Sequence, residues 1–302
     1  MRPLRLGTRA STLARWQTAH VGAMLRAAHP DLACEEITIS TEGDRDARTP
    51  LPEIGGKGVF TEALEQALRA EEIDLAVHSL KDVPVEDLPG LVLAALCCRT
   101  DPRDVVIARE GWTLDTLPAK AVVGTCSTRR SAQVLALRPD LRLADLRGNV
   151  DTRVRKAREG AYDAIVIAAA GVTRLGLGDA ISEYLPLERV LPAPGQGALA
   201  VECRTDDAAT LALVRTLDDP VVRAAVLAER GFLEGLGGGC AAPIAAHATV
   251  DGHGMVRVRG LVASLDGRRV IRVEAMGAAR DARAVGLGLA AEALQRGAGE
   301  LL

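Results

Sequence analysis

Short apolar runs alternate with amphipathic stretches along most of this 302-residue chain, and that alternation restricts the fold more than any other feature. Such a pattern is typical of strands connected by helices, which build largely parallel sheets in α/β folds. The expected strands are 3–7, 35–40, 74–77, 91–98, 104–108, 121–125, 141–146 and 163–169. The expected helices follow Ser11, begin near Phe60 and Thr128, and cover 150–158.

Two linkers divide this alternation into domains. Residues 99–103 contain an Asp-Pro pair, and residues 191–197 contain two prolines and two glycines, so neither segment is expected to continue a helix or a strand. After the second linker the chain is expected to return to the first domain, with a strand at 199–201 and a helix near 207–216. Two crossings of this kind are found in periplasmic-type binding proteins, whose two α/β domains face a cleft.

The C-terminal segment predicts a small α+β domain. A helix at about 219–236 precedes three strands and a last helix, and Asp-Gly pairs between the strands favour hairpins. The strands are expected at 243–250, 255–263 and 269–275, and the last helix at 281–296. The expected fold is therefore α/β, with two periplasmic-binding-protein-like domains around a cleft and a small C-terminal α+β domain. The expected boundaries are 1–98 with 198–217 for domain 1, 103–192 for domain 2 and 219–302 for domain 3.

Composition and charge argue against several kinds of partner. The net charge of −3 gives no reason to expect nucleic acid or an anionic membrane surface, and no apolar stretch is long enough to span a bilayer. The six cysteines form no C-x-x-C pair, so we expect no metal site. Scattered thiols in a chain of this size favour a reducing compartment, and we expect a cytoplasmic protein.

Arginine residues lie where the strands of domain 2 meet the segments that follow them. Only four of the 37 basic residues are lysines. The arginines that follow three successive expected strands are Arg129 and Arg130, then Arg147 and Arg153, then Arg174. They are expected at one edge of the sheet, beside helix N-termini that also attract anions. Because guanidinium groups bind carboxylates by two parallel hydrogen bonds, the predicted ligand carries several carboxylates.

Domain 1 has polar residues at corresponding places. Arg9 and Ser11 follow the first strand, and Lys81 and Asp82 follow the third. The carboxyl ends of strands form the usual ligand edge of α/β sheets, so the neighbouring Lys81 and Asp82 are candidates for a functional role there. His78, which directly follows the same strand, is expected to hydrogen-bond the backbone.

Two glycine-rich loops supply the remaining candidates. Lys57 lies in Gly-Gly-Lys-Gly, which lacks the spacing of a nucleotide-binding P-loop and is expected to be a mobile loop carrying one cation. Cys240 follows three glycines and closely precedes Pro243, so it is expected on a tight loop with little side-chain cover. Its thiol is either an ordinary turn thiol or a reactive group.

Three functions are compatible with these features. The first is an enzyme whose cleft holds a polycarboxylate, with Asp82 serving cationic chemistry and Cys240 serving covalent attachment. The second is a two-domain binding protein for a small anion, and the third is a Cys–His hydrolase. A passive anion receptor gains nothing from a carboxylate at its ligand edge, and no histidine lies in an evident partner motif. The enzyme is therefore the favoured hypothesis.

Six segments of the chain resemble porphobilinogen deaminase, also called hydroxymethylbilane synthase, in order and over nearly the whole length. They are RLGTRAS at 5–11, GGKGVF at 55–60, AVHSLKDVP at 76–84, RGNV at 147–150, PGQG at 194–197 and GGC at 238–240. The resemblance implies that four porphobilinogen molecules are joined head to tail, with loss of ammonia, into the linear tetrapyrrole hydroxymethylbilane of haem biosynthesis. It also implies a monomer with a dipyrromethane cofactor that is attached to Cys240 by a thioether.

The resemblance further implies a role for each matching residue. Asp82 would be the catalytic residue, protonating the leaving amine and stabilising the cationic azafulvene. The implied cofactor-binding residues are Cys240, Lys81, Asp82, Ser11, Thr125, Ser127, Arg129, Arg130, Arg147 and Gly148. The implied substrate-binding residues are Arg9, Ser11, Arg147, Arg153, Arg174 and Gln196, and Lys57 would belong to the loop over the cleft.

Three residues depart from the family pattern. Thr12 stands where the family commonly has proline. Glu53 replaces a frequent lysine, so a cationic role is not expected at that loop position. Cys126 stands where the family usually has serine, and it places a second thiol near the arginines.

Overall fold

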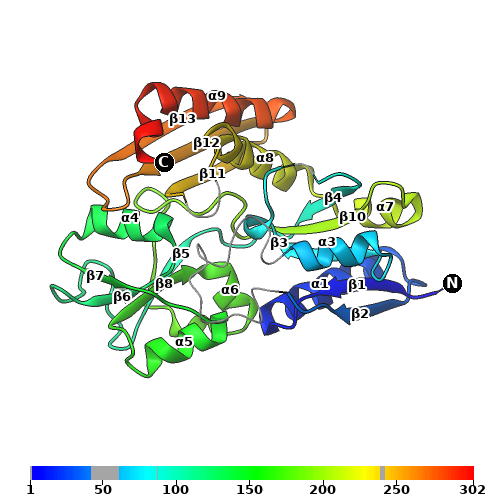
Figure 1. The fold of residues 1–302 in the computed structure, drawn as a ribbon, viewed down its shortest axis with the longest axis horizontal. Coiled ribbons are helices and arrows are strands. Elements are labelled where there is room, and N and C mark those ends of the chain that lie inside the picture. Colours follow the sequence, from blue (N-terminus) through cyan, green and yellow to red (C-terminus); the bar gives the residue numbers. More distant parts are fainter. Residues whose placement is uncertain (1, 42–60, 87, 239–241) are drawn as a thin grey trace. The chain divides into compact units, whose positions relative to one another are not determined.

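The structure, a computed structural model, describes residues 2–41, 61–86, 88–238 and 242–302. Its elements fall into two compact units, which are described separately (Figure 1). Unit 1 comprises Met1–Arg99 and Ala198–Arg223, and unit 2 comprises Thr100–Gly197 and Ala224–Leu302. The chain therefore passes from one unit to the other at the two segments where the sequence predicts linkers, and a third time between Arg223 and Ala224.

Unit 1 is built on a five-stranded sheet in the order β2-β1-β3-β10-β4. Its strands are β1 (Leu4–Thr8), β2 (Cys34–Thr38), β3 (Leu75–Ser79), β4 (Leu91–Cys97) and β10 (Leu199–Arg204). Strands β2, β1 and β3 are parallel, whereas β10 runs antiparallel between β3 and β4. The carboxyl ends of β1 and β3 thus lie at one edge of the sheet, as the sequence pattern predicts.

Three of the described helices pack on this sheet: α1 (Thr12–Ala28), α3 (Glu62–Arg69) and α7 (Ala208–Val214). The apolar spacing of α1 predicts that Trp16 faces the sheet, and this is wrong. Trp16 is 37% exposed and stacks on His20, with ring centroids 5.0 Å apart. Gln17 is buried instead, because its side-chain amide donates a hydrogen bond of 2.8 Å to Oγ of Ser79 at the end of β3.

Unit 2 contains a second five-stranded sheet, in the order β7-β6-β8-β5-β9. Strands β6, β7 and β8 are parallel, and β5 runs antiparallel to β8 and β9. The strands are β5 (Asp104–Ala108), β6 (Val122–Gly124), β7 (Arg142–Ala144), β8 (Ala164–Ala168) and β9 (Glu183–Tyr184). The helices are α4 (Thr128–Leu137), α5 (Val150–Arg158) and α6 (Ala169–Arg174). The short elements α6 and β9 were not predicted.

The rest of unit 2 is an antiparallel sheet with two helices. The elements are α8 (Pro220–Gly235), which begins in unit 1, β11 (Ile244–Val250), β12 (Met255–Ala263), β13 (Val270–Ala278) and α9 (Ala282–Gln295). Phe232 of α8 is completely buried against β12, and a Cβ at Gly260 would lie 2.5 Å from Cζ of its ring. A glycine at this position therefore admits the aromatic ring that fills this core.

These elements confirm the predicted fold class, with two α/β sheets and a small C-terminal α+β part. The division into three domains stays a prediction, because the structure groups most of the predicted domains 2 and 3 in one compact unit while giving each its own sheet. Among the described residues, no helix has the length and apolar character needed to cross a membrane.

Candidate active site

The polar residues expected in unit 1 lie at one edge of its sheet. Arg9 and Ser11 lie between β1 and α1, and Lys81 and Asp82 lie on a 3₁₀ turn, Leu80–Asp82, that directly follows β3. Since β1 and β3 are adjacent and parallel, both turns leave the sheet at the same end. This is the edge at which α/β sheets usually bind their ligands.

Asp82 has a carboxylate that is available for chemistry. The residue is half-buried, and no hydrogen bond or ion pair engages its carboxylate within the described ranges. The turn that carries it is closed by a hydrogen bond of 3.1 Å from the Val83 N–H to the Leu80 carbonyl. A carboxylate held in this way can exchange a proton with a bound molecule, and its charge can stabilise a developing cation.

Buried polar contacts fix the strand ends beneath this edge. Gln17 links α1 to Ser79, and Oγ of Ser11 caps α1 by accepting a hydrogen bond of 3.3 Å from its first turn. The expectation that His78 bonds the backbone is wrong. Its Nε2 lies 3.1 Å from Oε2 of Glu202 on β10, and both side chains are buried. The pair joins the two adjacent strands β3 and β10.

In unit 2, two predicted arginines share one buried carboxylate. Arg129 and Arg130 lie in the first turn of α4, and both bind Asp104, the first residue of β5. Nη1 of Arg129 lies 2.7 Å from Oδ2, while Nε and Nη2 of Arg130 lie 3.0 and 2.8 Å from Oδ1. Nη1 of Arg129 also donates to the Leu191 carbonyl at 2.7 Å. Two fixed cations face one anion, which leaves an excess of positive charge.

The mutual charges keep this cluster ionised. Burial alone would raise the pKa of Asp104, but the charges of Arg129 and Arg130 outweigh burial and hold that pKa far below its usual range. Burial lowers the pKa of Arg129, against the opposing charge of Asp104. Guanidinium groups remain protonated at neutral pH in such surroundings. The cluster therefore offers charged donors whose positions are set before any ligand binds.

Both guanidinium groups keep donors for a further anion. The hydrogen bonds of Arg129 use only Nη1, and those of Arg130 use only Nε and Nη2, within the part of the chain that the structure describes. Ser127 caps α4 by accepting from the Arg130 N–H at 3.4 Å, and Thr125 accepts from the Ser127 N–H at 3.3 Å. The hydroxyl hydrogens of both can still donate. This donor set, at a helix N-terminus, fits carboxylates.

Side-chain hydrogen bonds to Asp104 and Glu229 hold the turn that contains Gln196. The side-chain amide of Gln196 is completely buried and donates to Oδ1 of Asp104 at 2.9 Å. Glu229, which the sequence analysis did not identify, accepts hydrogen bonds of 2.7 Å from the N–H groups of Gly195 and Ala248. The structure therefore gives Gln196 a supporting contact to the arginine cluster, and its contact with substrate stays a prediction.

The next candidates lie at the start of α5. Arg147 and Gly148 precede this helix, and Nε of Arg153 within it donates to the Gly148 carbonyl at 2.7 Å. Since β6 and β7 are parallel, this turn and the start of α4 lie at the same edge of the sheet. The first two of the three arginine-bearing junctions are thus placed as predicted.

Gly148→Ala is expected to destabilise the protein by about 1–3 kcal/mol. Gly148 has a φ of +110°, and a Cβ there would lie 2.9 Å from Cγ2 of Thr152. Urea unfolding measures the loss. Gly178→Ala is the matched control, because Gly178 has an ordinary φ and a Cβ there meets no atom within 4 Å. Equal stabilities of the two variants would contradict the strain assigned to Gly148.

Arg174 does not lie beside a helix N-terminus, and this part of the sequence prediction is wrong. The unpredicted helix α6 follows β8 directly and ends at Arg174. Nη2 of the nearly buried Arg174 donates to the Gly197 carbonyl at 2.8 Å. The side chain therefore reaches the same turn as Gln196 from the far end of a short helix.

Lys57, Glu53 and Cys240 lie outside the described residues. Thr12 is the first residue of α1, directly after the capping Ser11. Cys126 is half-buried between two of the hydroxyl residues at the start of α4, so a second thiol does lie close to the arginine cluster.

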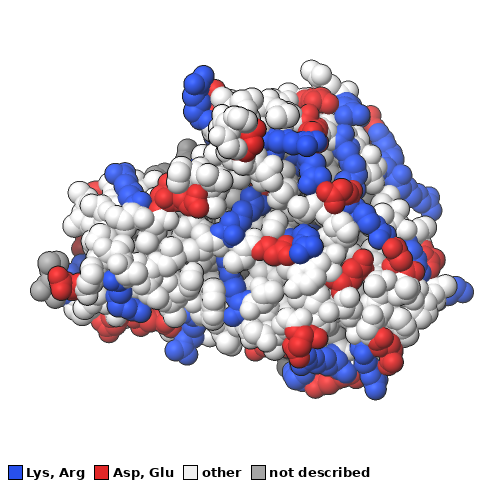
Figure 2. Space-filling model, turned by 180° about the vertical axis from the view of Figure 1, so that it is seen from behind, with Lys and Arg blue, Asp and Glu red and all other residues white. Residues whose placement is uncertain are grey.

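Many other arginines pair with carboxylates at the surface. Figure 2 shows basic and acidic side chains intermixed over one face of the molecule. Examples are Arg189 with Asp115, 2.6 Å apart, and Arg158 with Asp179, 2.9 Å apart. Exposed pairs of this kind contribute little to stability. The arginine content is therefore only partly explained by the candidate site.

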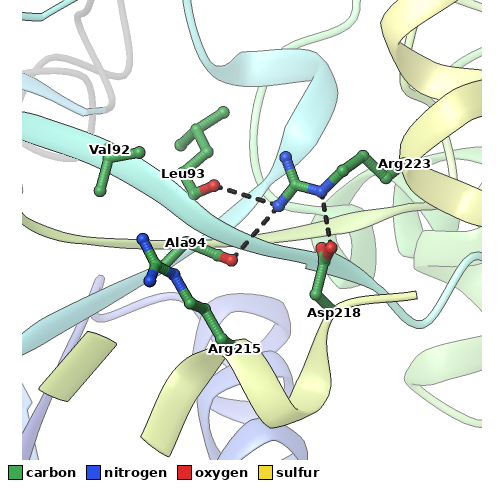
Figure 3. A pocket seen from close by; sticks show the side chains of 6 residues that line it. All are labelled: Val92, Leu93, Ala94, Arg215, Asp218 and Arg223. Atoms are coloured by element: carbon green, nitrogen blue, oxygen red, sulfur yellow. Dashed lines mark hydrogen bonds and ion pairs between the residues drawn. The ribbon is translucent and has the colours of Figure 1, made fainter. Parts of the chain in front are cut away.

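One hollow in unit 1, of about 390 Å³, is lined by none of the predicted site residues. Its lining residues are Val92, Leu93, Ala94, Arg215, Asp218 and Arg223 (Figure 3). Arg223 donates to Asp218 at 2.6 Å and to the carbonyls of Leu93 and Ala94. These contacts hold the start of α8 on β4, which gives Arg223 a structural role. Within the described ranges, no three His, Cys, Asp or Glu side chains gather as a metal site.

Comparisons with known proteins agree with the resemblance. Residues 4–212 match the family model "Porphobilinogen deaminase, dipyromethane cofactor binding domain", and residues 223–295 match "Porphobilinogen deaminase, C-terminal domain". The porphobilinogen deaminase of Syntrophomonas wolfei is 48% identical over 100% of this chain and 98% of its own. That of Brevibacillus brevis is 49% identical over 99% of this chain and 96% of its own.

Among solved structures, the effector binding domain of a BenM variant superposes with a TM-score of 0.43 at 14% identity, covering 72% of this chain and 94% of that one. The two family models together cover most of the chain, and the curated relatives match it almost from end to end. The chain therefore belongs to the porphobilinogen deaminase family.

Proposed function

We propose that the protein joins four porphobilinogen molecules head to tail into hydroxymethylbilane and releases ammonia at each step. The observation that supports this most directly is the available carboxylate of Asp82, at the carboxyl end of β3, in a chain of this family. A binding protein for small anions needs cations at that edge, whereas a reaction that passes through a cation needs an anion there.

Asp82 performs two tasks in the proposed reaction. As an acid it gives a proton to the aminomethyl nitrogen of porphobilinogen, so that the C–N bond breaks and ammonia leaves. As a carboxylate it then stabilises the positive charge of the resulting azafulvene until a pyrrole carbon attacks and the new C–C bond forms. The attacking carbon then loses its proton to solvent, which restores the pyrrole ring. One well-placed charge of this kind supplies about 3–4 kcal/mol of transition-state stabilisation.

The arginine cluster binds carboxylates in this proposal. Porphobilinogen and dipyrromethane both carry acetate and propionate groups, and the donors left on Arg129, Arg130 and the two hydroxyl residues before them fit such groups. When bound, dipyrromethane supplies the pyrrole carbon to which the first substrate is joined. Asp104 keeps both guanidinium groups in place, so that binding does not require them to be ordered.

The remaining assignments follow the family motifs. Cys240 is the proposed attachment residue, and Lys57 belongs to the proposed lid loop. The remaining proposed cofactor- and substrate-binding residues are Arg9, Ser11, Lys81, Arg147, Gly148, Arg153, Arg174 and Gln196. We further propose that residues 219–302 form the domain that carries the cofactor. The enzyme is proposed to act as a monomer in the cytoplasm, without a nucleic acid partner and without a metal in its reaction. Its scattered thiols support the cytoplasm, and its net charge of −3 argues against nucleic acid.

The proposal is tested by the intact mass of the purified, denatured protein and by turnover of porphobilinogen. We expect a mass excess equal to two linked pyrrole units, release of ammonia and formation of a linear tetrapyrrole. Cys240→Ser is expected to abolish the mass excess, whereas Cys126→Ser keeps it. An adduct that persists in Cys240→Ser and maps to Cys126 would overturn the assignment of the attachment residue. A chain that binds porphobilinogen without releasing ammonia would be a binding protein.

A further inference from the structure

Three sulfur atoms gather in unit 1, outside the residues proposed for porphobilinogen chemistry. Sγ of Cys98 lies 3.3 Å from Sγ of Cys97 and 3.2 Å from Sδ of Met24. The two cysteines are at the end of β4, and Met24 lies in the last turns of α1. Neither cysteine is part of a disulfide. The Cys98 thiol is thus within contact distance of both a second thiol and a thioether.

An unusual backbone conformation brings the two thiols together. Consecutive residues of a strand point to opposite faces of the sheet, which would separate the side chains of Cys97 and Cys98. Strand β4 ends at Cys97, and Cys98 has a φ of +54°, in the left-handed region that residues other than glycine seldom adopt. The chain turns there, and both sulfur atoms reach the same side. A left-handed backbone conformation is unfavourable for a cysteine, and its presence beside a cluster of sulfur side chains points to a function.

Burial suits this cluster to hold an ion out of water. Cys97 is 1% exposed, while Cys98 and Met24 are half-buried and give access from the surface. The cluster lies against the apolar core of unit 1, so a bound ion has little contact with solvent. Thiolate and thioether sulfur are soft donors, which favour Cu(I) over hard cations such as Mg²⁺ and Ca²⁺.

We propose that Cys97, Cys98 and Met24 form a binding site for Cu(I). On binding, each thiol loses its proton to solvent, and the two thiolates and the thioether donate electron pairs to the ion. The oxidation state of the metal and of every sulfur stays the same. The site does not depend on the cofactor cysteine or on any residue of the arginine cluster.

The other described cysteines help to define the site. Cys203 is completely buried, and burial raises the pKa of its thiol to about 12, so this residue offers no access from the surface. Cys34 is half-buried on β2 and has no second sulfur within hydrogen-bond distance among the residues that the structure describes. Cys34 therefore serves as a matched control for a single, partly accessible thiol.

Competition with bicinchoninate, a chromogenic Cu(I) chelator, tests the proposal. The complete protein is kept reduced with a phosphine under anaerobic conditions and is titrated against the copper–chelator complex. We expect a single Cu(I) per chain to be withdrawn from the chelator. Cys98→Ser should weaken this binding by at least about tenfold, since it removes a thiolate ligand. Met24→Leu should weaken it less, and Cys34→Ser should leave it unchanged.

X-ray absorption of the copper-loaded protein gives a second readout, for which we expect a first shell of sulfur only. Circular dichroism checks that each variant is folded, and Met24→Leu, which nearly preserves side-chain volume, decides the outcome if Cys98→Ser fails to fold. Unchanged affinity in both Cys98→Ser and Met24→Leu would overturn the proposal. Loss of binding in Cys34→Ser, or nitrogen and oxygen ligands in the absorption spectrum, would overturn it as well.

Discussion

Asp82→Asn is expected to lower porphobilinogen turnover by about 10²–10⁴-fold, while the protein folds and keeps its covalent cofactor. The substitution preserves the shape of the side chain on its 3₁₀ turn but removes both the transferable proton and the negative charge. Since no hydrogen bond engages the carboxylate within the described residues, little of the fold depends on it. Turnover is measured as ammonia released per chain.

Two controls separate chemistry from stability in this experiment. Asp31→Asn removes an exposed carboxylate of the same unit and should leave turnover unchanged. The intact mass of Asp82→Asn should still show the two pyrrole units, which establishes that the loss lies in catalysis. Near-normal turnover of Asp82→Asn would remove Asp82 from the mechanism, whatever the mass shows.

Asp104→Asn is expected to lower the free energy of unfolding by about 3–5 kcal/mol. The neutral amide would leave Arg129 and Arg130 buried without the carboxylate that compensates them. Asp115→Asn is the matched control, because it also breaks a pair with an arginine, Arg189, but at the surface. We expect that control to cost less than about 1 kcal/mol. The free energies of unfolding are measured in urea. Similar decreases in the two variants would show that burial does not make the Asp104 ion pairs more important than a surface pair.

The contribution of Asp104 should also depend on pH in a definite direction. The pKa of Asp104 is lowered in the folded protein from an ordinary value of 3.8, so folding favours its charged form. Its stabilising effect is therefore complete above that ordinary value and decreases as the pH falls below about 4. The stability difference between the wild-type protein and Asp104→Asn should shrink over the same range. A difference that grows on acidification would contradict the assigned ion pairs.

Local sequence patterns were sufficient for most of the fold. The strand at 104–108 and the helix at 150–158 were predicted to the residue, because apolar runs and helical spacing are properties of a few neighbouring residues. Helix α6 has six residues and strand β9 has two. Both were missed because segments this short do not show a hydrophobic period. Missing α6 led directly to the wrong placement of Arg174.

The candidate site was only partly predictable, because its supporting contacts join distant parts of the chain. Asp104 binds Arg129 and Arg130, which follow it by 25 and 26 positions, and Gln196, which follows it by 92 positions. No local sequence pattern therefore reveals the cluster. The one signal in the sequence was Asp104 itself, a carboxylate at the start of an otherwise apolar strand. A charge buried in this way needs a partner of opposite charge. The burial of Gln17 was unpredictable for the same reason, because it depends on a hydrogen bond to Ser79, 62 positions further along the chain.

The position of β10 has a consequence for how the chain is made. Among the described strands of unit 1, β4 pairs with β10 alone, and β10 comes from residues 199–204. While a ribosome synthesises the first two hundred residues, β3 and β4 therefore both present unpaired backbone edges. Pairings between such distant parts of a chain form slowly and leave unpaired strand edges exposed in the meantime. Nascent chains that stop before residue 199 are thus the forms of this protein most in need of a chaperone.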